Sequence, residues 1–179
     1  MRPRLPRRRT TVLAALLLLV LAGCRRGLPP PSQGYRVVRV LDGDTIEVLK
    51  DGRPARVRLY GIDTPERGQP FGNAARRFTG EQCFGRTVLL REYGADRYGR
   101  ILAEVILPDG RVLNQELVRA GLAWWYREYA PEARELERLE REARAARRGL
   151  WADPRAVPPW EYRRYQGAGT QAPLRRGDR

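Results

Sequence analysis

The feature that most constrains the fold is a series of five short segments with the β-branched, partly alternating composition of half-buried strands. They span residues 35–41, 45–49, 55–60, 87–93 and 101–107. Asp-Gly pairs at 42–43 and 51–52 indicate turns that join the first three segments as antiparallel strands. A segment of helical composition, residues 73–79, follows the third strand and ends at Gly80. Five strands with a helix inserted there predict an α+β fold built on a five-stranded OB-type barrel.

Two further helices are predicted after the strands, which gives about three helices packed on the barrel. Asn114 is placed to cap a short helix over residues 115–120, which stops at Gly121. The longest periodic segment, residues 131–148, begins with a proline suited to a first turn. Its apolar stripe runs among glutamates and arginines and consists of Ala133, Leu136, Leu139, Ala143 and Ala146. The folded domain is therefore predicted to span residues 35–152.

Both ends of the chain are predicted to lie outside that domain. Residues 1–23 combine five arginines, an apolar run and a Leu-Ala-Gly sequence directly before Cys24, which resembles a bacterial lipoprotein signal. Acylated Cys24 would anchor an exported protein to a membrane, facing the periplasm or the exterior; the alternative is a plain secretory signal with a chance cysteine. Residues 24–34 are predicted to form a flexible tether, and residues 153–179 a polar, disordered tail.

The net charge and the absence of histidine limit the partners that the chain can bind and the reactions that it can catalyse. The formal net charge is +14, of which the five arginines of residues 1–23 account for +5, so +9 remains for the rest of the chain. This excess favours nucleic acid as a partner, although anionic lipid would attract the same charge. The chain has no histidine, so Ser-His-Asp, Cys-His and histidine-ligated zinc chemistry are excluded. Cys83 has no neighbouring histidine or cysteine and is expected to be buried and inert.

Three short runs carry the remaining candidates for chemistry, and each lies where a strand meets a turn. They are residues 42–45, 58–66 and 96–100. A phosphodiester hydrolase without histidine needs a cation, a carboxylate that activates water, and guanidinium groups for phosphoryl charge. Asp44 and Asp63 can offer hard oxygen ligands to calcium or magnesium, and Glu66 can position water. Arg58 and Arg100 can hold phosphate from two directions.

These runs, in this order and spacing, resemble the staphylococcal nuclease (thermonuclease-like) family over about residues 35–151. The resemblance implies an OB barrel with three helices, one calcium ion, and attack of water on DNA or RNA that leaves 5′-hydroxyl and 3′-phosphate ends. The metal ligands it implies are Asp44, Asp63 and the backbone carbonyl of Thr64. The implied catalytic residues are Arg58, Glu66 and Arg100.

The same resemblance implies a substrate surface formed by Arg97, Tyr98, Tyr126 and Tyr129. Arg127 stands where residue counting would place an aromatic, so Tyr126 and Tyr129 are alternatives for that position. Trp124 and Trp125 are also consistent with a core position. Stacking of bases on such rings contributes ~1–3 kcal/mol per base with little sequence preference.

Three alternatives compete with the catalytic interpretation. In a purely structural arrangement, Arg58 pairs with Asp63, Glu66 caps the next helix and Asp44 stabilises a turn. A non-catalytic, membrane-tethered OB module would bind nucleic acid or a protein partner through its basic surface. A structural lipoprotein would explain Cys24 and the charge only. Several carboxylates and two arginines in one pocket favour a functional site, and a monomeric enzyme is expected.

Overall fold

A computed structural model describes residues 34–167. The predicted signal segment and Cys24 lie outside the described residues. Residues 168–179 of the predicted tail lie outside them as well. Among residues 34–167, no helix is both long enough and apolar enough to cross a membrane.

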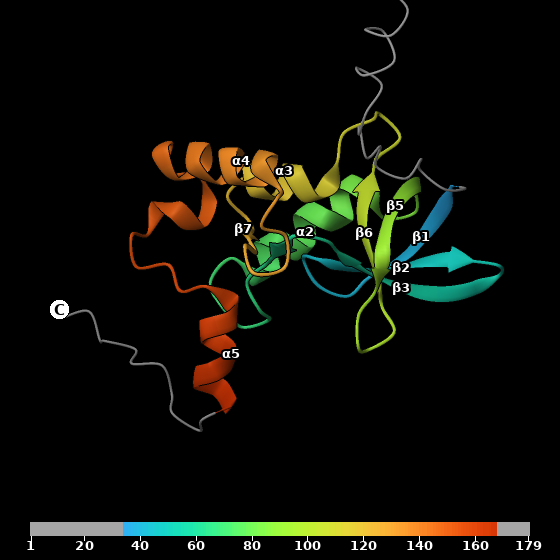
Figure 1. Ribbon diagram of the computed structural model, residues 1–179, viewed down its shortest axis with the longest axis horizontal. Coiled ribbons are helices and arrows are strands. Elements are labelled where there is room, and N and C mark those ends of the chain that lie inside the picture. The colour runs from blue at the N-terminus through green and yellow to red at the C-terminus, as the bar shows by residue number, and fades with distance from the viewer. Residues whose placement is uncertain (1–33, 168–179) are drawn as a thin grey trace, which may run out of the picture. The chain divides into compact units, whose positions relative to one another are not determined.

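Five strands close into a barrel in the order β1-β2-β3-β6-β5 (Figure 1). Their bounds are Tyr35–Val40 (β1), Thr45–Lys50 (β2), Arg53–Leu59 (β3), Thr87–Ala95 (β5) and Ile101–Ile106 (β6). Neighbouring strands are antiparallel except β3 and β6, which are parallel. The predicted α+β fold with a five-stranded barrel is confirmed.

The barrel interior is filled by aliphatic side chains from alternating strand positions. Val37, Ile46, Val48, Val57, Val88 and Leu90 are each at most 1% exposed. Burial of one such side chain stabilises the fold by about 1.5–3 kcal/mol. β-Branched residues suit these positions because their stiff side chains pack well on a pleated surface.

Helices and one 3-10 turn cover the barrel and extend beyond it. They are α2 (Gly72–Cys83), α3 (Leu113–Arg119), α4 (Arg134–Ala145), η1 (Gly149–Ala152) and α5 (Pro159–Gly167). α3 and α4 pack against each other (Figure 1). α2 continues past Gly80, where the sequence predicted its end, because Thr79 and Cys83 share a buried face on its last turn.

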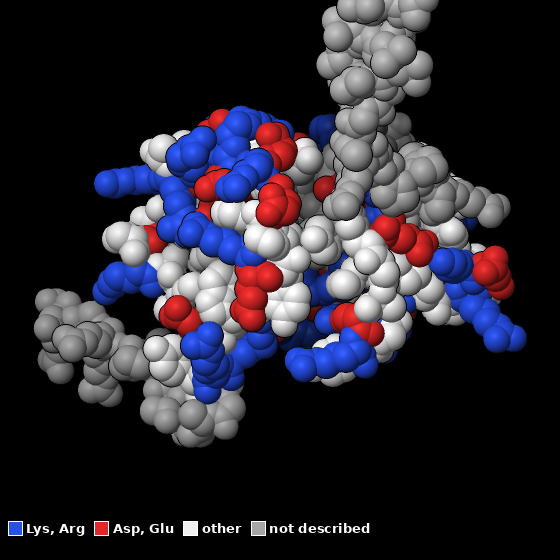
Figure 2. Space-filling model, in the orientation of Figure 1, with Lys and Arg blue, Asp and Glu red and all other residues white. Residues whose placement is uncertain are grey.

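Most of the predicted apolar stripe of α4 faces the interior. Leu136, Leu139 and Ala143 are buried and Ala133 packs against the core, but Ala146 is exposed just after the end of the helix. Apart from the buried Glu140, glutamates and arginines cover the outer surface of the helix. Blue and red side chains accordingly alternate over this part of the molecule (Figure 2). Arg138 pairs with both Glu135 and Glu142. Such exposed pairs contribute ~0.3–0.5 kcal/mol each, so packing of the apolar stripe stabilises the helix far more than they do.

The prediction that Asn114 caps α3 is wrong. α3 begins after Val112, and Asn114 lies inside the helix with 1% of its surface exposed. Its side-chain oxygen accepts a hydrogen bond from the Val105 amide at 3.0 Å, and its side-chain nitrogen donates to the Tyr60 carbonyl at 2.9 Å. The amide therefore ties α3 to the ends of β3 and β6 instead of closing the helix terminus.

The prediction of a disordered tail from residue 153 is wrong for the described part of that tail. α5 forms within it, after the η1 turn in which Leu150 and Trp151 are buried. The helix docks because Trp160 stacks on Tyr126 and Gln69 donates to the Val157 carbonyl. These contacts come from distant parts of the chain, so the local polar composition does not indicate them.

Candidate active site

A cavity of about 900 Å³ opens where β3 ends and β2 and β6 begin. Ten of the predicted site residues line it: Asp44, Arg58, Asp63, Thr64, Glu66, Arg97, Tyr98, Arg100, Tyr126 and Tyr129. Cys24 lies outside the described residues. The three sequence runs are thus brought together around one cavity.

Strand pairing and one close backbone contact set the positions of the central residues. Thr45 lies opposite Arg58 in the β2–β3 ladder. The two-residue strands β4 (Ile62–Asp63) and β7 (Trp124–Trp125) hold Asp63 opposite Trp124, and both tryptophans are buried as core residues. A Cβ atom at Gly43 would lie 2.8 Å from Thr64 Oγ1. Glycine is therefore required where the turn before Asp44 approaches Thr64.

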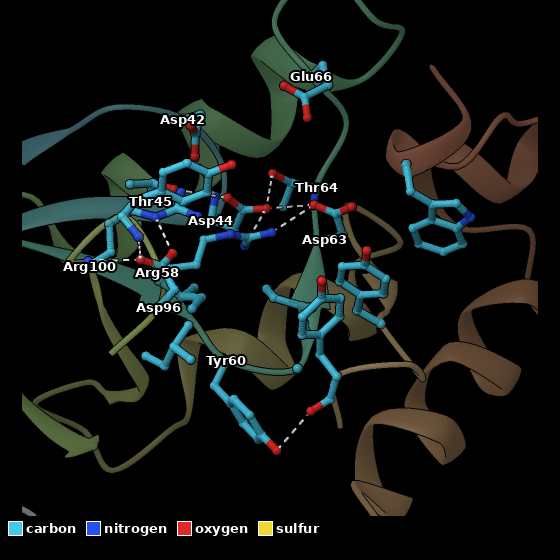
Figure 3. A pocket seen from close by; sticks show the side chains of 18 of the residues that line it. Asp42, Asp44, Thr45, Arg58, Tyr60, Asp63, Thr64, Glu66, Asp96 and Arg100 are labelled. Carbon is cyan, nitrogen blue, oxygen red and sulfur yellow. Dashed lines mark hydrogen bonds and ion pairs between the residues drawn. The ribbon is translucent and has the colours of Figure 1, made fainter. Parts of the chain in front are cut away.

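Arg58 bridges the two aspartates at the centre of the cavity (Figure 3). Its Nη1 lies 2.7 Å from Asp44 Oδ2, and its Nη2 donates to Asp63 Oδ1 at 2.7 Å. Asp44 Oδ2 also accepts hydrogen bonds from the Thr64 amide at 2.8 Å and the Thr64 hydroxyl at 2.9 Å. The four side chains are nearly buried, so their electrostatic interactions are weakly screened by solvent.

Burial and neighbouring charges shift the pKa values of the acidic groups in different directions. Burial alone would raise the pKa of Asp44, but Arg58 and the Thr64 hydrogen bonds lower it. Burial and the charge of Asp44 raise the pKa of Asp63 against the effect of Arg163 and Arg58. Burial and Asp44 raise the pKa of Asp42 to about 7. For Asp42 and Asp63 burial is the largest cause, so the cavity opposes ionisation of these two carboxyl groups despite the nearby guanidinium groups.

This donor set fits a hard divalent cation. Asp44 and Asp63 supply carboxylate oxygens to one cavity, and the backbone carbonyl of Thr64 follows Asp63 directly. Calcium prefers such oxygen ligands and fills its coordination shell with water. Within residues 34–167, no three histidine, cysteine or acidic side chains form a ready metal cage. The predicted calcium ligands do not require such a cage, because only two of them are carboxylates.

Glu66 occupies the edge of the cavity and has no capping role. It is half-buried, and its carboxylate accepts a hydrogen bond from Arg163 Nη1. The prediction that it could cap the next helix is wrong, because α2 starts after Phe71 without a side-chain cap. Asp44 does more than stabilise its own turn: its side chain accepts a hydrogen bond from the Thr45 hydroxyl beside it and also binds the distant Thr64.

Arg100 enters the cavity with Asp96 and Tyr98. Its Nε donates to Asp96 Oδ2 at 2.7 Å, and its guanidinium lies 5.5 Å from the centre of the Tyr98 ring. Arg97 lies at 5.1 Å from the same ring. Tyr98 is 69% exposed, so its ring is accessible from solvent. Asp96 and Arg100 lie on the side of Arg58 away from Asp63 (Figure 3).

Aromatic residues line another side of the cavity. The rings of Tyr126 and Tyr129 lie 4.5 Å apart, and the Tyr60 hydroxyl donates to the Tyr129 carbonyl at 3.2 Å. Both alternatives for the substrate tyrosine are therefore present at the cavity. Trp160 of α5 stacks on Tyr126 with a centroid distance of 5.1 Å and an interplanar angle of 7°.

Sequence reasoning missed several residues of the cavity, chiefly Asp42, Trp160 and Arg163. Asp42 belonged to a run that was already singled out, so its proximity to Asp44 was a usable signal. Arg163 Nη2 donates to Asp63 Oδ2 at 2.8 Å across 100 sequence positions. No local pattern indicates a contact of that separation.

A profile of the family described as staphylococcal nuclease homologue matches residues 56–153. An uncharacterized endonuclease from Escherichia coli is 48% identical over 128 residues, which cover 72% of this chain and 83% of the relative. A micrococcal nuclease from Shigella flexneri is 44% identical over 137 residues, covering 72% of this chain and 79% of the relative. The profile match includes every predicted site residue from Arg58 to Tyr129 and begins after Asp44.

Proposed function

The chain belongs to the staphylococcal nuclease family, and from this membership we propose that it is a calcium-dependent endonuclease. Its reaction is hydrolysis of phosphodiester bonds in DNA, RNA or both, with water as the nucleophile and 5′-hydroxyl and 3′-phosphate ends as products. The observation that carries the proposal is the nearly buried Arg58, which bridges Asp44 and Asp63 in a cavity that also holds Glu66 and Arg100.

Asp44, Asp63 and the carbonyl of Thr64 are the groups that would hold calcium. A bound ion would supply positive charge that attracts the phosphate and polarises its oxygens. Burial and the charge of Asp44 raise the pKa of Asp63, and a bound cation would oppose that shift because it favours the ionised carboxylate.

The protein's own residues supply the remaining functions. Glu66 accepts a proton from the attacking water, because it is half-buried at the cavity edge and carries an ionisable carboxylate. Arg58 and Arg100 donate hydrogen bonds to the phosphoryl oxygens, whose charge grows in the transition state. Arg58 Nη1 is buried and forms an ion pair with Asp44 Oδ2 at 2.7 Å.

The exposed rim of the cavity is proposed to hold the nucleotide. Arg97 supplies positive charge, and the rings of Tyr98, Tyr126 and Tyr129 supply flat surfaces for sugar or base. These contacts do not read base edges, so broad substrate preference is expected.

The test is hydrolysis of DNA and RNA by the purified protein, with calcium or with a chelator, beside Glu66→Gln and Arg100→Ala. We expect calcium-dependent cleavage, with losses of roughly 10²–10⁴-fold for Glu66→Gln and roughly 10²–10³-fold for Arg100→Ala. Glu81→Gln, an exposed position on α2, is the control and should retain full activity. Equal cleavage in chelator would overturn the metal requirement. Binding without cleavage by the parent would favour the non-catalytic module.

We also propose that Cys24 is acylated and holds the exported enzyme on a membrane. The proposal rests on the arginines, the apolar run and the Leu-Ala-Gly-Cys sequence at the start of the chain. Cys24→Ser should release the exported protein from the membrane fraction and abolish incorporation of labelled fatty acid. Unchanged labelling would refute acylation at this residue.

A further inference from the structure

The C-terminal helix α5 contributes three residues to the cavity wall: Trp160, Arg163 and Arg164. Two of them contact residues to which the proposed function assigns a ligand. Arg163 contacts Asp63 and Glu66, and Trp160 covers a face of Tyr126. The position of α5 is thus coupled to the same groups that calcium, water and nucleotide would use.

Arg163 contacts both carboxylate oxygens of Asp63. Its Nη2 donates to Asp63 Oδ2 at 2.8 Å and its Nη1 to Asp63 Oδ1 at 3.4 Å, while Arg58 donates to Oδ1 as well. Two guanidinium charges therefore already face this carboxylate. A divalent cation must displace one of them or bind against its repulsion. Arg163 is the easier to displace, since its side chain is 45% exposed and that of Arg58 is 13% exposed.

Trp160 covers Tyr126 on the aromatic side of the cavity, much as Arg163 covers Asp63. Its ring is stacked on Tyr126 with a centroid distance of 5.1 Å and is nearly parallel to it. A nucleobase that stacks on this face of Tyr126 needs the position that the indole holds. α5 thus places a cation on Asp63 and Glu66 and a flat ring on Tyr126, which are the two chemical features of a metal-bound nucleotide.

The helix is also held by packing of Trp160 against the buried cluster of Trp124, Ala143, Leu150 and Trp151. Gln69 donates to the Val157 carbonyl at 2.6 Å just before α5. Among residues 159–166 of α5 only Pro159 is buried, whereas Arg163, Arg164, Tyr165 and Gln166 are exposed. Elements with little buried apolar surface open at low free-energy cost. Undocking of α5 would leave the barrel core intact, because none of the core residues belongs to α5.

We propose that α5 is an internal competitor of the ligands: it occupies the site through Arg163 and Trp160, and it leaves when calcium and nucleic acid bind. The inference rests on the proposed function, because the competition exists only if Asp63 binds the metal and Tyr126 the nucleotide. Docking of α5 and ligand binding are then linked reciprocally, so weaker docking raises apparent ligand affinity.

Calcium titration by calorimetry without substrate tests this coupling in the full chain. Arg163→Ala and Trp160→Ala should each bind calcium roughly 3- to 10-fold more tightly than the parent. The tryptophan variant is decisive because it weakens docking without changing charge, whereas loss of Arg163 also removes a nearby positive charge. Arg155→Ala is the control, because Arg155 lies on the same C-terminal segment and pairs only with Asp153 among described residues.

Hydrogen exchange gives a second readout. In the parent, amide exchange within α5 should increase when calcium and a phosphorothioate oligonucleotide are added together, while exchange in β2 and β3 stays slow. Unchanged calcium affinity in Trp160→Ala, or α5 amides that become more protected with ligand, would overturn the proposal. If the parent still cleaves DNA in calcium, the proposed function survives that outcome. Absence of both calcium binding and cleavage would reject the two together.

Discussion

Arg58 is the residue on which the site depends most at the level of single side chains. It lies between two carboxylates with a contact of 2.7 Å to each. A lysine would keep the charge, but its single nitrogen cannot reproduce the planar fork that spans both aspartates. Replacing Arg58 with lysine therefore tests the geometry of the guanidinium group separately from its charge.

We expect Arg58→Lys to lower kcat by about 10²–10³-fold, because it removes an aligned donor to the transition-state phosphate. The measurement is steady-state cleavage of a labelled oligonucleotide in calcium. Arg56→Lys is the matched control on the same strand, since Arg56 pairs with Glu47 and its side chain is 63% exposed. Equal activity of Arg58→Lys and the parent would show that charge alone suffices.

Cys83 gives a pH-dependent prediction far from the cavity. Burial raises the pKa of its thiol to about 12 from an ordinary value of 9.0. Above pH 9 the unfolded chain loses the thiol proton while the folded chain keeps it. The contribution of the protonated Cys83 thiol to the free energy of unfolding is thus fully present below pH 9, and it is lost as pH rises towards 12. Relative to Cys83→Ala, the parent should lose about 1.4 kcal/mol per pH unit in that window, measured by urea unfolding.

At the scale of elements, the attachment of α3 to the barrel rests on Asn114. Its side chain satisfies the Val105 amide and the carbonyls of Tyr60 and Ala103. Asn114→Ala leaves buried polar groups without partners and should reduce the free energy of unfolding by about 3 kcal/mol. Chemical denaturation measures the loss. Gln115→Ala, at the half-buried next position, should change stability by less than about 0.5 kcal/mol.

The elements differ in how far the sequence predicted them. The barrel strands and α4 were predictable because their apolar residues recur with the period of the structure they form. Asn114 was misassigned because a polar residue before an apolar helical segment has the same local pattern whether it caps the helix or bonds elsewhere. α5 was missed because its stability comes from Trp160 on Tyr126 and Arg163 on Asp63, contacts made across the fold.

For the whole molecule, positive charge should govern how substrate binds. Arg58, Arg97 and Arg100 line the cavity of a chain with a formal net charge of +14. If these three arginines contact phosphates of a single strand, kcat/KM should fall about 10- to 20-fold between 50 and 200 mM salt. Since salt screens association more than the buried chemistry, kcat should change little. A flat kcat/KM over this range would contradict phosphate contacts by these residues.

The site was predictable where each role demanded a particular residue type. Without histidine, carboxylates and arginines were the groups left for phosphodiester chemistry, and the ten candidates from Asp44 to Tyr129 line one cavity. The pairing of Arg58 with both aspartates, and the contacts of Arg163, required the closed barrel and the docked helix. Local sequence does not encode those distances.

The most direct test of the central claim is the chemical identity of the ends made from a labelled oligonucleotide in calcium. The account predicts fragments with free 5′-hydroxyl groups, which a polynucleotide kinase phosphorylates without prior phosphatase treatment, and no fragments when calcium is chelated. Cleavage that continues in chelator, or fragments that carry 5′-phosphates, would contradict the account.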